Sequence, residues 1–331
     1  MRTLEYAEST DRRIAITIGS RPGVEYAGLS DREIMEDARK KVQAVSAFVR
    51  RHDPDIVFSI AGPMGEAQTL GARVSLPEFG SPVATFRPLE STDNLGQLTV
   101  DAEPCSFMLC GTLVESIGVL AKMYPEKLVT ATVIGPLTVA GQLMGVEKML
   151  MKSVEARDSL ARVLDIVTER VIAILQLQIE AGARHLHVAD PTSSLLSPMS
   201  FSELSLPYLK RIFKSVQISN HLHICGNTNN HLTYLAKTTA HAVSVDTEVD
   251  MKKAAQIFGP QIAVCGQISS AGVLLRGTSR EVNDATNTML QEMAMYRNYI
   301  PATSCGMPRA TPGENIQAFY DTVRCFKQVR E

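Results

Sequence analysis

The stretch His221-Leu222-His223-Ile224-Cys225-Gly226 ends an apolar run and places a histidine and a cysteine two residues apart, directly before a glycine. Side chains of a β-strand alternate between its two faces, so in a strand His223 and Cys225 point the same way and can bind one metal ion. Far downstream, Ser304-Cys305-Gly306 ends another such run with a second Cys-Gly step. One imidazole and two thiolates form the ligand set of a catalytic zinc ion with an open fourth position.

Short runs of this kind alternate with longer amphipathic stretches along almost the whole chain, which is typical of parallel strands joined by helical crossovers. The eight candidate strands are residues 14–18, 56–60, 130–134, 185–189, 221–225, 242–246, 262–265 and 299–303. Eight strand-helix units predict an α/β fold, a (β/α)8 TIM barrel, that forms a single domain over residues 1–331.

The connection between the second and third candidate strands, residues 62–128, is too long for one crossover. We interpret it as an insertion with a small hairpin and a helix near residues 105–123. Insertions on a barrel usually lie at one mouth, where they form a lid or a partner surface. Residues 1–13 are charged at several positions and are expected to be loosely ordered.

The charge of the chain is balanced, with 33 Lys and Arg against 35 Asp and Glu. Such a balance gives no field that favours nucleic acid or an anionic membrane as a partner. The sequence has neither an apolar signal core at its start nor a run of about 18 apolar residues that would cross a bilayer. The six cysteines are too sparse for a disulfide framework. We therefore expect a soluble, cytoplasmic protein.

Barrel enzymes place their chemistry at the carboxyl ends of the strands. The residues found there are Gly19, Ala61, Gly135, Asp190, Cys225, Asp246, Gly266 and Cys305. Acids, thiols and glycines therefore crowd one rim. Asp190 and Asp246 are the catalytic candidates, and Asp190 is expected to orient a substrate or a ligand.

Strands five and eight end on the same rim of a closed barrel, so Cys305 can share an ion with His223 and Cys225. This mixture favours zinc, because magnesium prefers oxygen ligands and an iron–sulfur cluster usually uses four cysteines. Glu248, just past the sixth strand, is expected to fill the fourth position in the resting protein, and Asp246 is the competing acid. Zinc with two thiolates is suited to hold an incoming thiol as a thiolate, whose sulfur then attacks a methyl group.

Three histidines outside this set lie on neighbouring candidate strands. His221 is one pleat deeper than His223, and we interpret it as a core residue or a support for the metal ligands. His185 and His187 repeat the spacing on the fourth strand, where they either line the cavity or pack in the core.

The chain resembles the uroporphyrinogen decarboxylase superfamily, and within it the zinc-dependent corrinoid methyltransferases, most of all the methylcobamide:coenzyme M methyltransferases. The matching pieces are residues 134–140, 189–194, 197–198, 207–210, 223–228, 244–246 and 304–308. In this branch a histidine, the cysteine two residues later and a distant cysteine bind zinc, which implies His223, Cys225 and Cys305. The resemblance implies methyl transfer between a corrinoid on a partner protein and a small-molecule thiol. No Asp-x-His-x-x-Gly motif of cobalamin-binding modules is present in the sequence.

Three alternatives stay open on the sequence alone. The first keeps the zinc but reverses the direction of methyl transfer, so that a methoxylated or methylated substrate gives its methyl group to the corrinoid protein. The second is a metal-free decarboxylase of tetrapyrrole carboxylates, which is disfavoured because residues 18–23 lack the Arg-Gln-Ala-Gly-Arg core of that branch. The third is a barrel that binds a tetrapyrrole or a corrinoid without turnover. The sequence also departs from the superfamily at residues 266–270, where Gly-Gln-Ile-Ser-Ser replaces the usual Gly-Asn-Ile-Asp-Pro.

Overall fold

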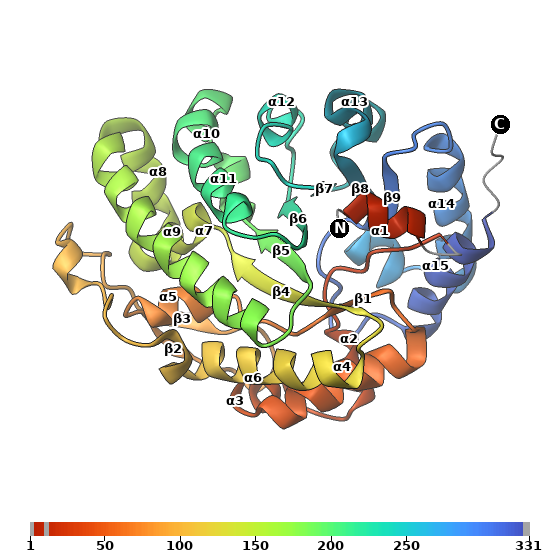
Figure 1. Ribbon diagram of the computed structural model, residues 1–331, viewed down its shortest axis with the longest axis horizontal. Helices are drawn as coiled ribbons and strands as arrows, with labels where there is room; N and C mark the ends of the chain where they lie inside the picture. Colours follow the sequence, from red (N-terminus) through yellow and green to blue (C-terminus); the bar gives the residue numbers. More distant parts are fainter. Residues whose placement is uncertain (1–2, 10–12, 327–331) are drawn as a thin grey trace.

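The computed structural model describes residues 3–9 and 13–326, and its centre is a curved sheet of seven parallel strands (Figure 1). The strand order is β1-β4-β5-β6-β7-β8-β9, so the strands of this sheet follow one another in chain order, with only β2 and β3 left out between β1 and β4. The bounds are β1 Ile56–Phe58, β4 Leu128–Ile134, β5 His185–Ala189, β6 Ser219–Ile224, β7 Ala242–Val245, β8 Ala263–Ile268 and β9 Tyr299–Thr303. The predicted α/β fold with consecutive parallel strands is confirmed.

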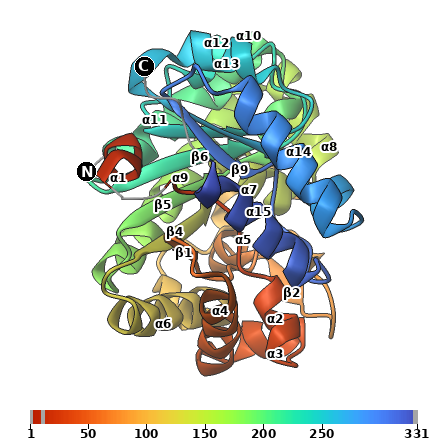
Figure 2. The same ribbon diagram turned by 90° about the vertical axis from the view of Figure 1, so that its right-hand side faces the viewer.

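Helices surround the outer side of this sheet in both views (Figures 1 and 2). The strands β4 to β7 are each followed directly by a Gly, Asp or Cys residue, and the helices around the sheet pack their apolar faces on it. The longer helices are α4 Ala38–His52, α6 Met108–Met123, α7 Pro136–Met144, α8 Val146–Glu155, α9 Arg157–Glu180, α11 Leu206–Lys214, α13 Met251–Phe258, α14 Ser279–Glu292 and α15 Gly313–Cys325. The shorter ones are α2 Pro22–Tyr26, α3 Asp31–Glu36, α5 Gly65–Thr69, α10 Pro198–Leu204 and α12 Leu232–Leu235.

The first predicted strand, residues 14–18, differs from the prediction, since it joins the sheet through a single parallel bridge between Ile16 and Ala302 of β9. The ladder stops there because the Ile18 amide donates to the Thr303 hydroxyl instead of to a backbone carbonyl. Within the described residues no ladder joins this segment to β1. The eighth place of the predicted barrel is therefore held by an irregular segment.

Side chains nevertheless fill the inside of the curved sheet across that gap. Ile14 and Ile16 share one buried cluster with Ile56 and Phe58 of β1 and with Ile300 of β9. A larger buried cluster lies between the sheet and the surrounding helices. Apolar packing thus holds the two sheet edges near each other without backbone hydrogen bonds between them.

The long connection after β1 contains β2 (Arg73–Ser75) and β3 (Val83–Phe86), which pair antiparallel, and then α6. None of the helices in the described part of the chain has both the length and the apolar composition needed to cross a membrane.

The start of the chain also differs from the expectation of loose order. Residues Thr3–Ser9 form α1, while residues 1–2 and 10–12 lie outside the described part. The helix is fixed at the amino ends of the strands, because the buried Thr3 hydroxyl donates to the Asn220 carbonyl and the Tyr6 hydroxyl donates to the Asp55 carbonyl.

Candidate metal centre and cavity

The three residues expected to bind a metal come together at the carboxyl ends of the strands. His223 lies near the end of β6, Cys225 follows that strand, and Cys305 follows β9. The Cys225 and Cys305 sulfurs are 3.3 Å apart, and His223 Nε2 is 3.0 Å from the Cys225 sulfur. All three ligand atoms lie within 4.8 Å of one another. Two strands far apart in the sequence therefore converge on one point.

Hydrogen bonds determine which nitrogen of His223 faces the sulfurs. The Ser244 hydroxyl donates to the Leu222 carbonyl at 3.4 Å, so it accepts a hydrogen bond from His223 Nδ1 at 2.9 Å. A neutral His223 with its proton on Nδ1 has a free lone pair on Nε2. This is the arrangement by which a histidine binds a metal while its other nitrogen donates to a supporting group.

The two thiols interact as a pair. The hydrogen bond that Cys225 donates to Cys305 raises the pKa of Cys225 and lowers the pKa of Cys305. Partial burial opposes the charged form of each sulfur, so without a cation the pair retains one proton between its sulfurs. A divalent cation bound here would replace that proton, because it would stabilise both thiolates together.

The backbone around the cysteines is fixed by side chains from neighbouring loops. Gly226 turns the chain directly after Cys225 with a φ of +80°, a conformation that favours glycine, and its amide donates to Asp246 Oδ2 at 3.0 Å. On the other side, the Ser270 hydroxyl accepts from the Cys305 amide at 3.2 Å and donates to the Cys305 carbonyl at 2.7 Å. Both thiols are thereby held on short, constrained segments.

The donor set fits zinc. In a tetrahedral site with zinc–sulfur bonds of about 2.3 Å, two sulfurs are about 3.8 Å apart, which is slightly more than the 3.3 Å observed between these two. The cluster thus needs only a small expansion to enclose an ion. Nitrogen and sulfur donors with no carboxylate among them favour zinc over magnesium or calcium.

The acidic residues predicted for the site have three different environments. Asp246 is half-buried beside Cys225, where its carboxylate accepts from the Gly226 and Thr247 amides. Glu248 is exposed and lies outside the cluster of ligand atoms found among the described residues, because the turn after β7 carries it away from the sulfurs. The predicted role of Glu248 as the fourth ligand stays a prediction.

Asp190 is fully buried and does not line the cavity described below. Its carboxylate accepts from the Thr138 amide and hydroxyl and from the Ser193 hydroxyl, while its own amide donates to the His223 carbonyl. The role of Asp190 in orienting a substrate or a ligand stays a prediction. In the structure Asp190 joins the start of α7 to β6, the strand that carries the candidate ligand His223.

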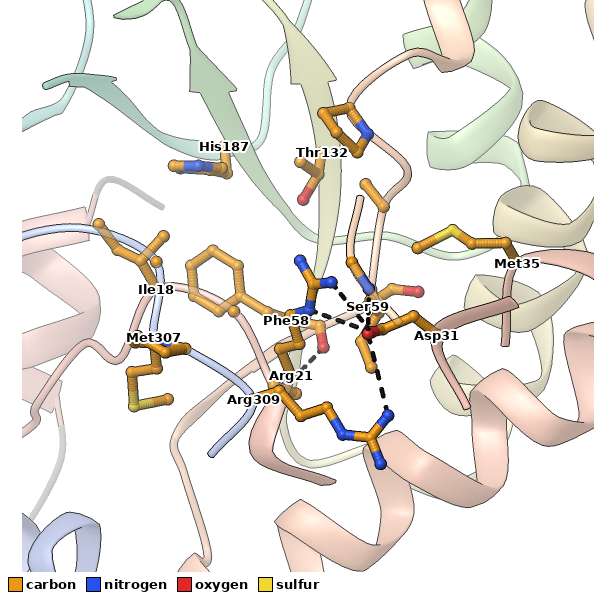
Figure 3. A pocket seen from close by; sticks show the side chains of 18 of the residues that line it. Ile18, Arg21, Asp31, Met35, Phe58, Ser59, Thr132, His187, Met307 and Arg309 are labelled. Carbon is orange, nitrogen blue, oxygen red and sulfur yellow. Dashed lines mark hydrogen bonds and ion pairs between the residues drawn. The ribbon is translucent and has the colours of Figure 1, made fainter. Parts of the chain in front are cut away.

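A cavity of about 730 Å³ opens at the same end of the sheet. Its wall runs from Gly306, next to Cys305, past apolar side chains such as Ile18 and Phe58 to a pair of arginines, and His187 forms part of its inner wall (Figure 3). The mixture of apolar surface and few polar groups is typical of a small-molecule site.

The two arginines, Arg21 and Arg309, flank the buried Asp31 in this cavity (Figure 3). Arg21 donates to Asp31 Oδ1 at 3.1 Å, whereas Arg309 Nη1 is 3.8 Å from Asp31 Oδ2. Arg309 also pairs with Glu25 through Nε, but its buried Nη1 has no hydrogen-bond partner. This nitrogen therefore has an ion pair with Asp31 but no hydrogen bond.

Sequence reasoning did not single out Arg21 or Arg309 as functional residues. Both follow strand ends of the same rim, Arg21 two residues after Gly19 and Arg309 four residues after Cys305. Their position could have indicated a functional role, because side chains that directly follow the strands gather at the carboxyl end of a barrel, where active sites lie.

Comparisons with known proteins find a matching family, similar sequences and a similar fold. Residues 16–326 match the model of the uroporphyrinogen decarboxylase (URO-D) family. A methylcobamide:CoM methyltransferase MtbA of Methanosarcina mazei is 30% identical over 252 residues, which cover 74% of this chain and 70% of the relative. A methylcobamide:CoM methyltransferase MtaA of Methanosarcina barkeri is 29% identical over 260 residues, covering 77% and 74%. A solved structure of a methyltransferase from Methanosarcina mazei has the same fold, with a TM-score of 0.88 at 23% identity over 97% of this chain and 98% of that one.

Proposed function

We propose that this chain, which belongs to the uroporphyrinogen decarboxylase (URO-D) family, is a zinc-dependent methyltransferase that moves a methyl group between a protein-bound corrinoid and a thiol. The observation that carries the proposal is the convergence of His223, Cys225 and Cys305 within 4.8 Å beside the cavity. Relatives named as methylcobamide:CoM methyltransferases support the choice of corrinoid and thiol.

In this proposal His223, Cys225 and Cys305 hold the ion, and the chemistry that zinc supplies is stabilisation of the acceptor sulfur as a thiolate at neutral pH. The chain's own residues then place the thiol. The Ser244 hydroxyl keeps the free lone pair of His223 directed at the sulfurs, and the apolar wall of the cavity excludes water from the acceptor. The corrinoid is expected on a separate protein that meets the open mouth.

The proposal is tested by two assays on the zinc-loaded protein. In one, methylcobalamin is supplied with small thiols; in the other, cob(I)alamin is supplied with methoxylated or methylated compounds. Loss of methylcobalamin, seen in its absorption spectrum, together with formation of the methyl thioether is the expected result of the first assay. Turnover only in the second assay contradicts the proposed direction, and activity in protein with less than about a tenth of an equivalent of zinc contradicts the metal's role.

Arg309 provides a prediction about the acceptor thiol. The positive charge of Arg309, which lines the cavity and whose Nη1 has no hydrogen bond, would attract a thiol with an acidic end, such as 2-mercaptoethanesulfonate, while the sulfur of that thiol lies near Cys305. Arg309→Met should therefore raise KM for this thiol by about 10- to 100-fold, with little change in kcat. This factor corresponds to the loss of one or two charge-assisted hydrogen bonds.

The neutral 2-mercaptoethanol should be used equally well by Arg309→Met and by the unsubstituted protein. Arg280→Met is the matched control, because Arg280 is 92% exposed and faces away from the cavity lining. An equal rise in KM for both thiols would contradict this prediction, because it would mean that Arg309 shapes the cavity by packing and does not recognise the charge of the thiol.

A further inference from the structure

Three buried histidines that the metal centre does not use form a continuous chain inside the sheet. His185 Nε2 is 2.8 Å from His221 Nδ1, and His221 Nε2 is 2.7 Å from His187 Nδ1. The register brings them together, because His187 lies opposite His221 and His185 lies opposite Ser219 in the pairing of β5 with β6. The chain begins near α1 and ends at the cavity, which His187 lines (Figure 3).

The direction of the hydrogen bonds is set at the end nearest α1. The Thr3 hydroxyl has one proton, which it donates to the Asn220 carbonyl at 3.0 Å. The 3.0 Å contact between the Thr3 and Ser219 hydroxyls therefore uses the proton of Ser219. Since the Ser219 hydroxyl has no second proton, its 2.9 Å contact with His185 Nδ1 is donated by His185.

The three imidazoles are neutral in this environment. Each imidazole is almost fully buried. The hydrogen bonds that link the three histidines to one another and to Ser219 involve no carboxylate. Burial lowers the pKa of His185, which lies farthest from the candidate metal centre, to about 3. A neutral imidazole has one proton, so a histidine that donates through Nδ1 can only accept through Nε2.

The direction therefore passes unchanged along the chain. His185 donates through Nδ1 and accepts at Nε2 from His221 Nδ1. His221 then accepts at Nε2 from His187 Nδ1. The only ring N–H of His187 is on Nδ1 and donates to His221, so His187 Nε2 carries a lone pair and can only accept a hydrogen bond.

We propose that these three hydrogen-bonded histidines fix His187 Nε2 as a hydrogen-bond acceptor in the cavity. The site would then select ligands that present a neutral hydrogen-bond donor to this nitrogen. A second observation points to a ligand at the same place. Thr132, which lies opposite His187 in the pairing of β4 with β5 and lines the same cavity, has a buried hydroxyl without a hydrogen-bond partner. The choice of thiols as the ligand class rests on the proposed function, whereas the direction of the chain does not.

The direction can be measured by long-range ¹H–¹⁵N correlation NMR of the zinc-loaded, ¹⁵N-histidine-labelled protein, which reports the tautomer of each ring. The expected result is a proton on Nδ1 of His185, His221 and His187. A His187 protonated on Nε2 overturns the proposal. This readout is independent of methyl transfer, so it separates a failure of the chain from a failure of the proposed function.

A remote variant tests the origin of the direction. Thr3→Val removes the hydroxyl that accepts from Ser219, which leaves Ser219 free to donate to His185 and lets the whole chain reverse. We expect a mixture of His187 tautomers in Thr3→Val and the original tautomer in Thr3→Ser, the matched control that keeps the hydroxyl. An unchanged His187 tautomer in Thr3→Val contradicts the proposal.

Ligand selection is tested with 2-mercaptoethanol and 2-methoxyethanethiol, which differ in having or lacking a hydroxyl proton. Titration calorimetry on the zinc-loaded protein should show tighter binding of 2-mercaptoethanol by roughly three- to tenfold, the effect of one hydrogen bond. The preference should disappear in His187→Phe and weaken in Thr3→Val, which also covers the case that His187→Phe fails to fold. Equal binding of the two thiols by the unsubstituted protein overturns the selection.

Discussion

Cys305→Ser is expected to lose both the zinc ion and methyl transfer. A serine hydroxyl stays protonated where a thiol ionises, so the variant retains only one sulfur and one nitrogen of the cluster. Zinc should fall from about one equivalent to below a tenth, and the loss of several kcal/mol of electrostatic stabilisation corresponds to a rate lower by on the order of 10³-fold or more.

Metal analysis after gel filtration and the methylcobalamin assay measure these two effects. Cys225→Ser should behave in the same way, whereas Cys325→Ser is the matched control, since Cys325 is an exposed thiol at the end of α15. A Cys305→Ser protein that keeps a full equivalent of zinc would show that the ion binds elsewhere. Circular dichroism must show that each variant is folded before its zinc content is interpreted.

The convergence of the three candidate ligands could be predicted because two general rules determine their placement. Alternation along a strand puts His223 and Cys225 on one face, and parallel strands bring their carboxyl ends to one rim, where Cys305 also lies. Both rules follow from the backbone alone. No rule of this kind governs the turn after β7, so the position of Glu248 was not predictable from residue type.

Residue type also failed to separate the two aspartates of the rim. Asp190 and Asp246 each follow a strand, but the start of α7 at Pro136 brings the Thr138 amide and hydroxyl to Asp190 and occupies its carboxylate. The histidine chain shows a similar limit. The sequence contains His185, His187 and His221 at alternating positions, yet only the register of β5 against β6 places their nitrogens within hydrogen-bonding distance. A shift by one residue would separate them.

The close contact between Gly135 and Asp190 leads to a prediction about stability. A Cβ atom at position 135 would lie 2.3 Å from Asp190 Cβ and 2.7 Å from Asp190 Oδ2, although the backbone there is ordinary extended chain with a φ of −67°. Gly135→Ala should therefore lower the free energy of unfolding by about 3 kcal/mol through overpacking, not through backbone strain. Urea denaturation measures this loss, provided that the dependence of the free energy of unfolding on urea concentration is the same in both proteins.

Gly118→Ala is the matched control, since a Cβ there meets nothing closer than 3.7 Å inside α6, and it should be neutral or stabilising by up to about 1 kcal/mol. The Asp190 amide donates to the His223 carbonyl, so an alanine at 135 should also weaken zinc binding at temperatures where the protein stays folded. A free energy of unfolding for Gly135→Ala within about 0.5 kcal/mol of that of the unsubstituted protein would contradict this prediction. It would mean that Asp190 moves freely and does not fix the strand that carries His223.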